Sequence, residues 1–136
     1  MRLAVFAVAL ALLASPPPAA AQQARSVPTI GYLGYPNEQS ESRWRDGFVR
    51  GLRDLGYVPG QSVVVDFRGY TGDGQARQVL NDFVRRKVDV IFVGPPFVAA
   101  AAKQATRDIP IVCGTCGDPV ENGLVNRAGF PGELVT

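Results

Sequence analysis

The sequence predicts an α/β fold in which a parallel sheet carries helices on both faces and so forms three layers. Two observations support this prediction. Short apolar runs rich in β-branched residues recur along the chain, and between them lie segments whose apolar residues repeat with a helical period. Because strands that alternate with helices over short connections pair in parallel with right-handed crossovers, the chain should fold as a series of βα units.

Four apolar runs have the length of a buried strand, and each is followed within two residues by a glycine that can begin a turn. The last run contains Pro110, which fits near the beginning of a strand because proline cannot donate to the ladder. The predicted strands are Thr29 to Leu33, Val63 to Phe67, Asp89 to Val93 and Ile109 to Cys113.

The first helix is predicted to begin at about Ser40, and Gly56 is well placed to end it. Its apolar residues recur at spacings of four, four and three, while arginine and aspartate occupy the other faces. This apolar stripe consists of Trp44, Phe48, Leu52 and Leu55, and Trp44 and Phe48 are expected to belong to the core.

Two further helices are predicted between the later strands. The second follows Asp73, which can cap it, and its apolar residues fall at i, i+3, i+4, i+7 and i+8 from Ala76. The third covers Phe97 to Ala105 and is rich in alanine, with Pro96 suited to its first turn.

The beginning of the chain predicts a secretory signal peptide. Arg2 gives a positive start, and Leu3 to Ala14 form an apolar run that as a helix would reach roughly 18 Å, short of the ~30 Å hydrocarbon core. Prolines then interrupt the run, and the alanines that end at Ala21 give the small-residue pattern that signal peptidase accepts.

The chain is therefore expected to have three parts. These are a signal peptide over residues 1–21, cleaved after about Ala21, a polar lead-in over residues 22–28, and an α/β lobe over residues 29–136. The mature protein is expected in the periplasm, with no membrane insertion after cleavage.

The composition argues against several classes of function. The precursor has 14 Lys+Arg and 12 Asp+Glu, and loss of Arg2 leaves 13 against 12, a net charge of +1. Such a balance gives no electrostatic reason to expect a nucleic acid as partner. Histidine is absent, which removes the commonest general base and the commonest metal ligand, so we expect no enzyme activity, no metal and no cofactor.

Ligands of an open parallel sheet bind beyond the carboxyl ends of its strands. Three predicted loops lie there: Gly34 to Ser40, Gly94 to Phe97 and Gly114 to Val120. In the third loop, Asp118 has two interpretations, an Asx turn or cap, and a carboxylate that meets a ligand's ammonium or hydroxyl group. Tyr35, at the end of the first strand, either packs on its own lobe or stacks on a ligand.

Two glycine pairs superficially suggest phosphate-binding loops. Gly31 with Gly34 and Gly72 with Gly74 do not complete the dinucleotide motif, and no lysine follows in the Walker pattern. Tight turns and close backbone packing are the favoured interpretation, which disfavours a secreted nucleotide- or phosphate-binding enzyme.

The two cysteines of the sequence, Cys113 and Cys116, leave three interpretations open. They can form a short-loop disulfide in an oxidising compartment, remain free and partly buried, or act as a redox-active pair. A thioredoxin-type site places its first cysteine at a helix N-terminus, whereas this pair follows a strand and continues into Gly117, Asp118 and Pro119. A metal site would need two further ligands. An extracytoplasmic thiol-disulfide redox protein is the alternative function.

Several segments, in one order, resemble substrate-binding proteins of ABC transporters, in the subfamily that includes tryptophan- and tyrosine-type binding proteins. Leu52 to Val63 is similar to the family segment GLRELGYVEGQNV, and Gly117 to Val125 is similar to GDPVxxGLV. Val88 to Ile91, Ala99 to Thr106 and Ile109 to Val112 are similar to a strand, a helix and a strand of the family. The resemblance covers essentially the whole chain after the signal peptide.

This resemblance implies the N-terminal lobe of a type I periplasmic-binding fold, in which two α/β lobes clamp a ligand between them. Pro95 stands where the family commonly has Thr or Ser, and the cysteine pair stands where the family has apolar residues. By position, the crevice loops of the family fall on the candidate ligand-binding residues Gly34, Tyr35, Gly94, Pro95, Gly117 and Asp118.

The implied function is that of an extracytoplasmic solute-binding component of an ABC importer, which captures a small amino-acid-like or organic solute without chemistry. Its implied partners are that solute and, for the full-length form, the ABC permease in the membrane. Residues 134–136 stand where the family's fifth strand begins. The chain is therefore expected to be a lobe truncated at the start of that strand and a fragment of a longer protein.

Overall fold

The computed structural model describes residues 26–35 and 38–125, and in them the predicted alternation of strands and helices is confirmed. In chain order the elements are β1 (Thr29–Gly34), α1 (Glu38–Asp54), β2 (Val64–Gly69), α2 (Asp73–Arg85), β3 (Val90–Val93), α3 (Pro96–Ala105) and β4 (Ile111–Cys113). Among these described residues, no helix combines the length and apolarity needed to cross a bilayer.

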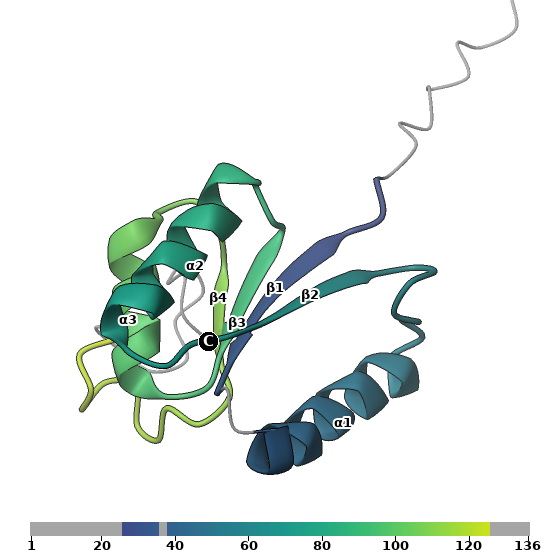
Figure 1. Cartoon of the computed structure of the whole chain (residues 1–136), viewed down its shortest axis with the longest axis horizontal. Helices are drawn as coiled ribbons and strands as arrows, with labels where there is room; N and C mark the ends of the chain where they lie inside the picture. The colour runs from purple at the N-terminus through teal and green to yellow at the C-terminus, as the bar shows by residue number, and fades with distance from the viewer. Residues whose placement is uncertain (1–25, 36–37, 126–136) are drawn as a thin grey trace, which may run out of the picture.

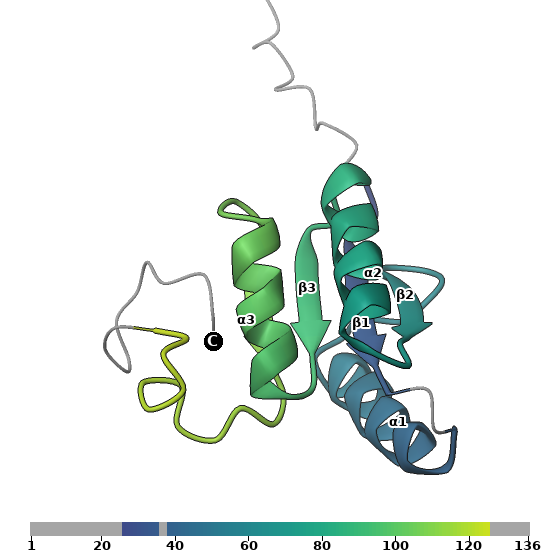
Figure 2. The ribbon, with the colours of Figure 1, turned by 60° about the vertical axis from the view of Figure 1, so that its left-hand side comes forward.

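The four strands form one parallel sheet in the order β2-β1-β3-β4. Helices α2 and α3 lie on one face of this sheet and α1 lies on the other, as the two views in Figures 1 and 2 show. The predicted three-layer architecture is therefore confirmed.

The core lies between the sheet and helices α2 and α3. The periodic apolar residues of α2 are buried against the sheet as predicted, and small alanines on α3 allow the two helices to pack side by side. Burying each large apolar side chain contributes roughly 1.5–3 kcal/mol to folding. The fully buried residues of this layer include Leu33, Leu80, Phe83, Ile91, Val93, Val98 and Ile111.

The opposite face of the sheet carries a row of aromatic rings. The register places Tyr32 of β1 opposite Phe67 of β2 and Phe92 of β3, with ring centroids 4.9 and 4.8 Å away. Phe48 of α1 packs on the row, 5.1 Å from Tyr32 and 4.8 Å from Phe92. Arg45 adds a cation–π contact, its guanidinium carbon 4.5 Å from the Phe67 ring centroid. This aromatic row (Tyr32, Phe67, Phe92) is the surface on which α1 packs.

Two residues of the predicted apolar stripe do not belong to the core. Trp44 is 58% exposed, so its prediction as a core residue is wrong, and Leu55 is 77% exposed. Leu55 falls outside the packed face because α1 ends at Asp54. Trp44 lies in the part of α1 that extends past the carboxyl ends of the strands, where it borders a pocket rather than the sheet.

The helix ends agree only in part with the sequence. Gly56, at φ +86°, ends α1 as predicted, because the Gly56 N–H donates to Arg53 and the Tyr57 N–H donates to Leu52 in a Schellman arrangement. The predicted cap at Asp73 is wrong. At α2 the side chain of Gln75 instead accepts the N–H of Thr71 at 2.7 Å.

The first strand begins at Thr29 as predicted, and the other three begin one or two residues later than predicted. The second strand starts at Val64, because Val63 forms a separate bridge with Pro59. The fourth starts at Ile111, after Pro110, whose carbonyl accepts the N–H of Ile91 at 2.9 Å.

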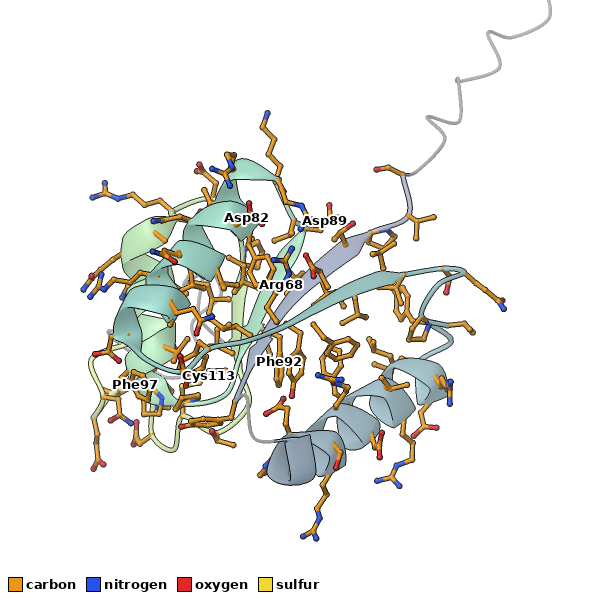
Figure 3. The ribbon with its side chains drawn as sticks, in the orientation of Figure 1. Arg68, Asp82, Asp89, Phe92, Phe97 and Cys113 are labelled. Carbon is orange, nitrogen blue, oxygen red and sulfur yellow. A yellow bond between two sulfur atoms is a disulfide. The ribbon has the colours of Figure 1, made fainter. Side chains whose placement is uncertain are left out.

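An ion-pair network joins β2 to α2 at the surface. Asp66 accepts hydrogen bonds from Arg68 at 2.8 Å and from Arg86 at 2.5 Å. Asp82 pairs with Arg85 at 2.5 Å and lies 3.7 and 3.6 Å from Arg68 and Arg86. Figure 3 shows Arg68 and Asp82 on these two elements. The hydrogen bond from Arg68 is the largest cause that lowers the pKa of Asp66 from its ordinary value.

We expect Gly31→Ala to lower the free energy of unfolding by about 1–3 kcal/mol. An added Cβ would lie 2.7–2.9 Å from three ring atoms of Phe83, which is fully buried and has no room to move. The matched control is Gly51→Ala in α1, where the Cβ meets open space. It should raise stability by about 0.5–1 kcal/mol, since alanine favours the helix. Urea unfolding measures the stability of both variants. A Gly31→Ala variant as stable as the native chain would contradict the close packing of Gly31 on Phe83.

We expect Asp66→Asn to lower stability at neutral pH by about 1 kcal/mol, a small effect because its arginine partners are half-exposed and solvent screens the pairs. A lowered carboxyl pKa means that the folded state favours the ionised form. This stabilisation is full above the ordinary pKa of about 4 and disappears as the pH falls through the lowered pKa. Urea unfolding at a series of pH values from 7 to 2 should therefore show that the difference in free energy of unfolding between the native chain and Asp66→Asn decreases as the pH falls. Asp46→Asn, at an exposed carboxylate of α1, is the control that should show no such convergence.

Candidate functional site

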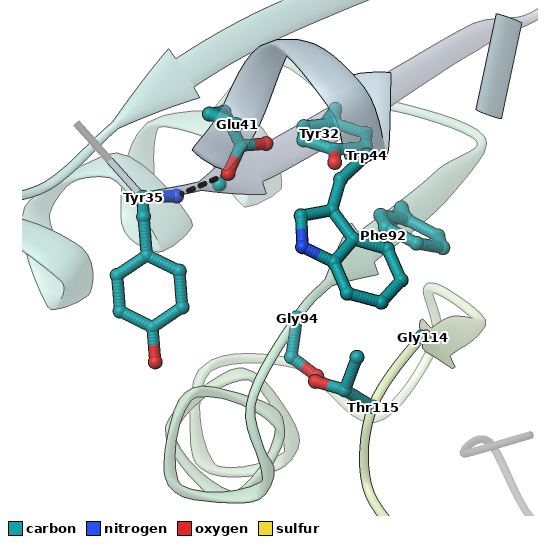
Figure 4. A pocket seen from close by; sticks show the side chains of 9 residues that line it. Tyr32, Tyr35, Glu41, Trp44, Phe92, Gly94, Gly114 and Thr115 are labelled. Carbon is teal, nitrogen blue, oxygen red and sulfur yellow. Dashed lines mark hydrogen bonds between the residues drawn. The ribbon is translucent and has the colours of Figure 1, made fainter. Parts of the chain in front are cut away.

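A pocket of about 210 Å³ opens at the carboxyl ends of β1, β3 and β4, beside the first turns of α1. This is the edge at which open parallel sheets bind their ligands. Figure 4 shows its walls from close by. The lining residues are Tyr32, Gly34, Tyr35, Glu41, Trp44, Phe92, Gly94, Gly114 and Thr115.

Aromatic side chains form much of the pocket wall. Tyr32 and Phe92, the inner part of the aromatic row, lie stacked with an interplanar angle of 17°. Trp44 of α1 also lines the pocket (Figure 4). Gly114 leaves room for Phe92, because a Cβ at that position would lie 2.7 Å from the tip of the ring. The pocket therefore offers flat apolar surfaces to a ligand.

Glu41 is the charged residue of the pocket lining. Its side chain is 6% exposed, and its Oε2 accepts the N–H of Tyr35 at 2.9 Å (Figure 4). Its Oε1 is buried without a hydrogen-bond partner among the described residues. Burial, and next the Glu41 carboxylate beside it, raise the pKa of Tyr32 above the ordinary range for tyrosine. Gly34 makes room for this carboxylate, since a Cβ there would overlap it.

The loop after β4 is fixed to the loop after β3. Thr115 donates both its N–H, at 3.1 Å, and its hydroxyl, at 2.7 Å, to the carbonyl oxygen of Gly94. Cys113 and Cys116 are joined in a disulfide, with their Cα atoms 5.6 Å apart, and Cys116 packs into the core. These links hold Gly114 and Thr115 at the pocket wall.

The cysteine pair has a different setting from a thioredoxin-type site. Cys113 is the last residue of β4, and residues 114–125 that follow form turns rather than a helix. Cys113 therefore does not begin a helix, as the first cysteine of a thioredoxin-type site does.

The structure brings together three of the six residues predicted to bind a ligand. Gly34, Tyr35 and Gly94 line the pocket. Tyr35 is 46% exposed, and its ring centroid lies 5.5 Å from that of Tyr70, so it both packs on its own lobe and faces the pocket.

The other three predicted residues do not line this pocket. Pro95 is buried as the N-cap of α3. Gly117, at φ +61°, shapes a turn, and Asp118 accepts the N–H of Val120 at 2.8 Å in the manner of an Asx turn.

Six residues line the pocket that were not among the predicted ones: Tyr32, Glu41, Trp44, Phe92, Gly114 and Thr115. Trp44 was assigned to the core. Glu41 stands three residues before Trp44 and seven before Phe48, on the apolar stripe of α1. A charged residue on an apolar stripe is a signal from which Glu41 could have been found.

The described residues contain no cluster of three histidine, cysteine, aspartate or glutamate side chains that could hold a metal ion. The arrangement instead combines apolar surfaces, one buried carboxylate and backbone carbonyls. Such a mixture is typical of a site that binds a small molecule.

An open parallel sheet with an apolar pocket beyond its carboxyl ends defines a small-molecule-binding α/β domain. Residues 36–136 match the model of the family of ABC transporter substrate binding proteins, and the chain belongs to this family. Proteins of this family bind solutes outside the cytoplasm for membrane transporters.

Relatives of known identity support this assignment. A tyrosine-binding protein of Clostridioides difficile is 36% identical over 108 residues, which are 79% of this chain and 31% of the relative. The ligand-free, open structure of a substrate-binding protein with adhesive properties from Clostridium difficile is 32% identical with a TM-score of 0.72, over 81% of this chain and 38% of that one.

Two further solved structures have the same fold. A conserved domain protein of Vibrio cholerae is 28% identical with a TM-score of 0.73. An ABC domain from Streptococcus pneumonia in complex with L-Trp is 27% identical with a TM-score of 0.72. Each match covers 82% of this chain and 38% of the other. The chain therefore spans about a third of the length of the proteins that it matches.

Proposed function

We propose that this chain forms the N-terminal lobe of an extracytoplasmic solute receptor for an ABC importer. Its role is to capture a small amino-acid-like solute without chemical conversion and to present it to a membrane permease. The observation that carries this proposal is the pocket at the carboxyl edge of the sheet, where apolar walls surround one buried carboxylate. Family membership supports the same conclusion.

The proposed solute class is that of amino acids with a large apolar or aromatic side chain. The aromatic rings of Trp44 and Phe92 suit such a group, because aromatic rings stack well in offset or edge-on arrangements. One relative is a tyrosine-binding protein, and one similar structure holds L-Trp.

A second lobe is proposed to complete the site. The pocket of about 210 Å³ is smaller than the ~300–1,000 Å³ typical of small-molecule sites. Its rim leaves large apolar side chains in solvent, with Tyr35, Trp44 and Phe97 at 46%, 58% and 49% exposure. Figure 3 shows Phe97 at the same edge of the sheet. A lobe that closed over this edge would cover these surfaces and enclose the solute.

A binding function without catalysis is supported by what the pocket offers. The Thr115 hydroxyl is engaged with the Gly94 carbonyl, and the sequence contains no histidine that could activate it. No cluster of side chains that could hold a metal ion lies beside Glu41 among the described residues.

The site of action is proposed to be the periplasm, after removal of residues 1–21 as a signal peptide. We expect the protein recovered from that compartment to begin at Gln22, because the small residues that end at Ala21 suit signal peptidase. Intact-mass measurement decides this. A mass that retains the apolar run from Leu3 would contradict both the cleavage and the proposed soluble form.

We expect the 136-residue chain to bind L-Trp and L-Tyr with dissociation constants near millimolar. A single lobe lacks about half of the contacts, and a loss of ~4 kcal/mol weakens a micromolar site about a thousandfold. Trp44 is the single tryptophan, so its indole N–H signal in NMR spectra is a specific probe of the pocket. Titration should move that signal, while titration with L-Asp should not.

Two controls sharpen this experiment. Trp44→Leu should abolish binding measured by calorimetry, and Tyr57→Leu, at an exposed aromatic residue outside the pocket, should leave it unchanged. No response to any amino acid would contradict the proposed function. Micromolar binding by the monomer would show that a second lobe is unnecessary.

A further inference from the structure

The Glu41 carboxylate combines deep burial with an unused hydrogen-bonding oxygen. It is 6% exposed, and Oε1 has no partner among the described residues, although it lines the pocket. An ionised group removed from water destabilises the fold unless it is paired, and its unmade hydrogen bonds add to that cost. A ligand that donates a hydrogen bond to Oε1 would supply the partner that this oxygen lacks.

The backbone and a neighbouring glycine fix this acceptor in position. Oε2 is bound to the N–H of Tyr35 at 2.9 Å, and the space that the carboxylate occupies exists because residue 34 is a glycine. The charged group is therefore preorganised rather than free to turn toward solvent, which lowers the cost of binding to it.

The surroundings favour a positive charge from outside the chain. No described residue that lines the pocket is lysine or arginine. Arg45, which lies nearby in sequence, stacks instead over Phe67 in the part of the aromatic row away from the pocket. The rings of Trp44 and Phe92 attract cations through their π-electrons.

We propose that Glu41 binds the ammonium group of the solute, so that this lobe selects primary amines with an apolar or aromatic body. The ammonium would donate to Oε1, and the apolar body would lie against Trp44 and Phe92. This inference rests on the proposed solute-binding function and adds to it: the lobe recognises the amine end of an amino acid, and needs no carboxylate on the ligand.

Three probes that share a phenethyl body and differ in the charge of their end group test the proposal in the native 136-residue chain. They are phenethylamine, phenethyl alcohol and hydrocinnamate, each titrated while the indole N–H signal of Trp44 is followed. We expect the amine to bind most tightly, the alcohol next and the acid least. The amine should bind at least about tenfold more tightly than the acid, as a charge-assisted hydrogen bond allows.

Glu41→Gln keeps the shape of the side chain and removes its charge. It should weaken the amine at least about tenfold and leave the alcohol and the acid unchanged or slightly tighter. Asp46→Asn, which removes an exposed carboxylate from the same helix, is the matched control and should change none of the three. Circular dichroism and the thermal midpoint establish that both variants fold, and the native-chain ranking tests the proposal independently of either variant.

The outcomes separate this proposal from the one on which it rests. If the acid binds as well as the amine, or if folded Glu41→Gln keeps full affinity for the amine, the role of Glu41 is overturned and solute binding stands. If L-Trp or L-Tyr moves the Trp44 signal and phenethylamine does not, the amine selection is likewise overturned. If no compound moves the signal, both proposals fail.

Discussion

The stacking of Tyr32 between Phe67 and Phe92 is the contact on which both α1 and the pocket depend. β1 is an inner strand of the sheet, so its parallel register fixes the neighbours of Tyr32 on both sides. Phe48 packs on the resulting aromatic row and holds α1 against that face. The same row ends in the pocket wall at Phe92. The packing that positions the helix therefore also places Trp44 and Glu41 beside the carboxyl ends of the strands.

Glycines at defined positions make this arrangement sterically possible. Gly31 faces α2 and leaves room for Phe83, Gly34 leaves room for Glu41, and Gly114 leaves room for Phe92. None of the three has a positive φ, so space and not backbone conformation requires glycine here. These contacts support close packing, rather than phosphate binding, as the role of Gly31 and Gly34.

The sequence predicted the features that local patterns determine. Strand and helix alternation and the buried face of α2 follow from hydrophobic periodicity, which is a property of neighbouring residues. The site was predicted less completely. The rule that ligands bind beyond strand ends identified the three loops that contribute residues to the pocket wall, but it does not say which side chains turn inward. The Asp118 carboxylate accepts a hydrogen bond within its own loop, and Pro95 is the N-cap of α3. Gly34 and Gly94, in contrast, line the pocket. Periodicity gives the side of α1 on which Trp44 lies, but not how far the helix extends beyond the sheet.

The pocket edge departs from ordinary protein surfaces in two opposite ways. Tyr35 and Trp44 leave large apolar surfaces in water, while Glu41 is withdrawn from it with an oxygen unpaired. Each departure costs stability, and a folding core would contain neither. One event relieves both costs, namely the arrival of an ammonium group attached to an apolar body. Neither feature stabilises the fold, so a purely structural role does not explain why both occur at the same edge. Together they favour a ligand-binding site there.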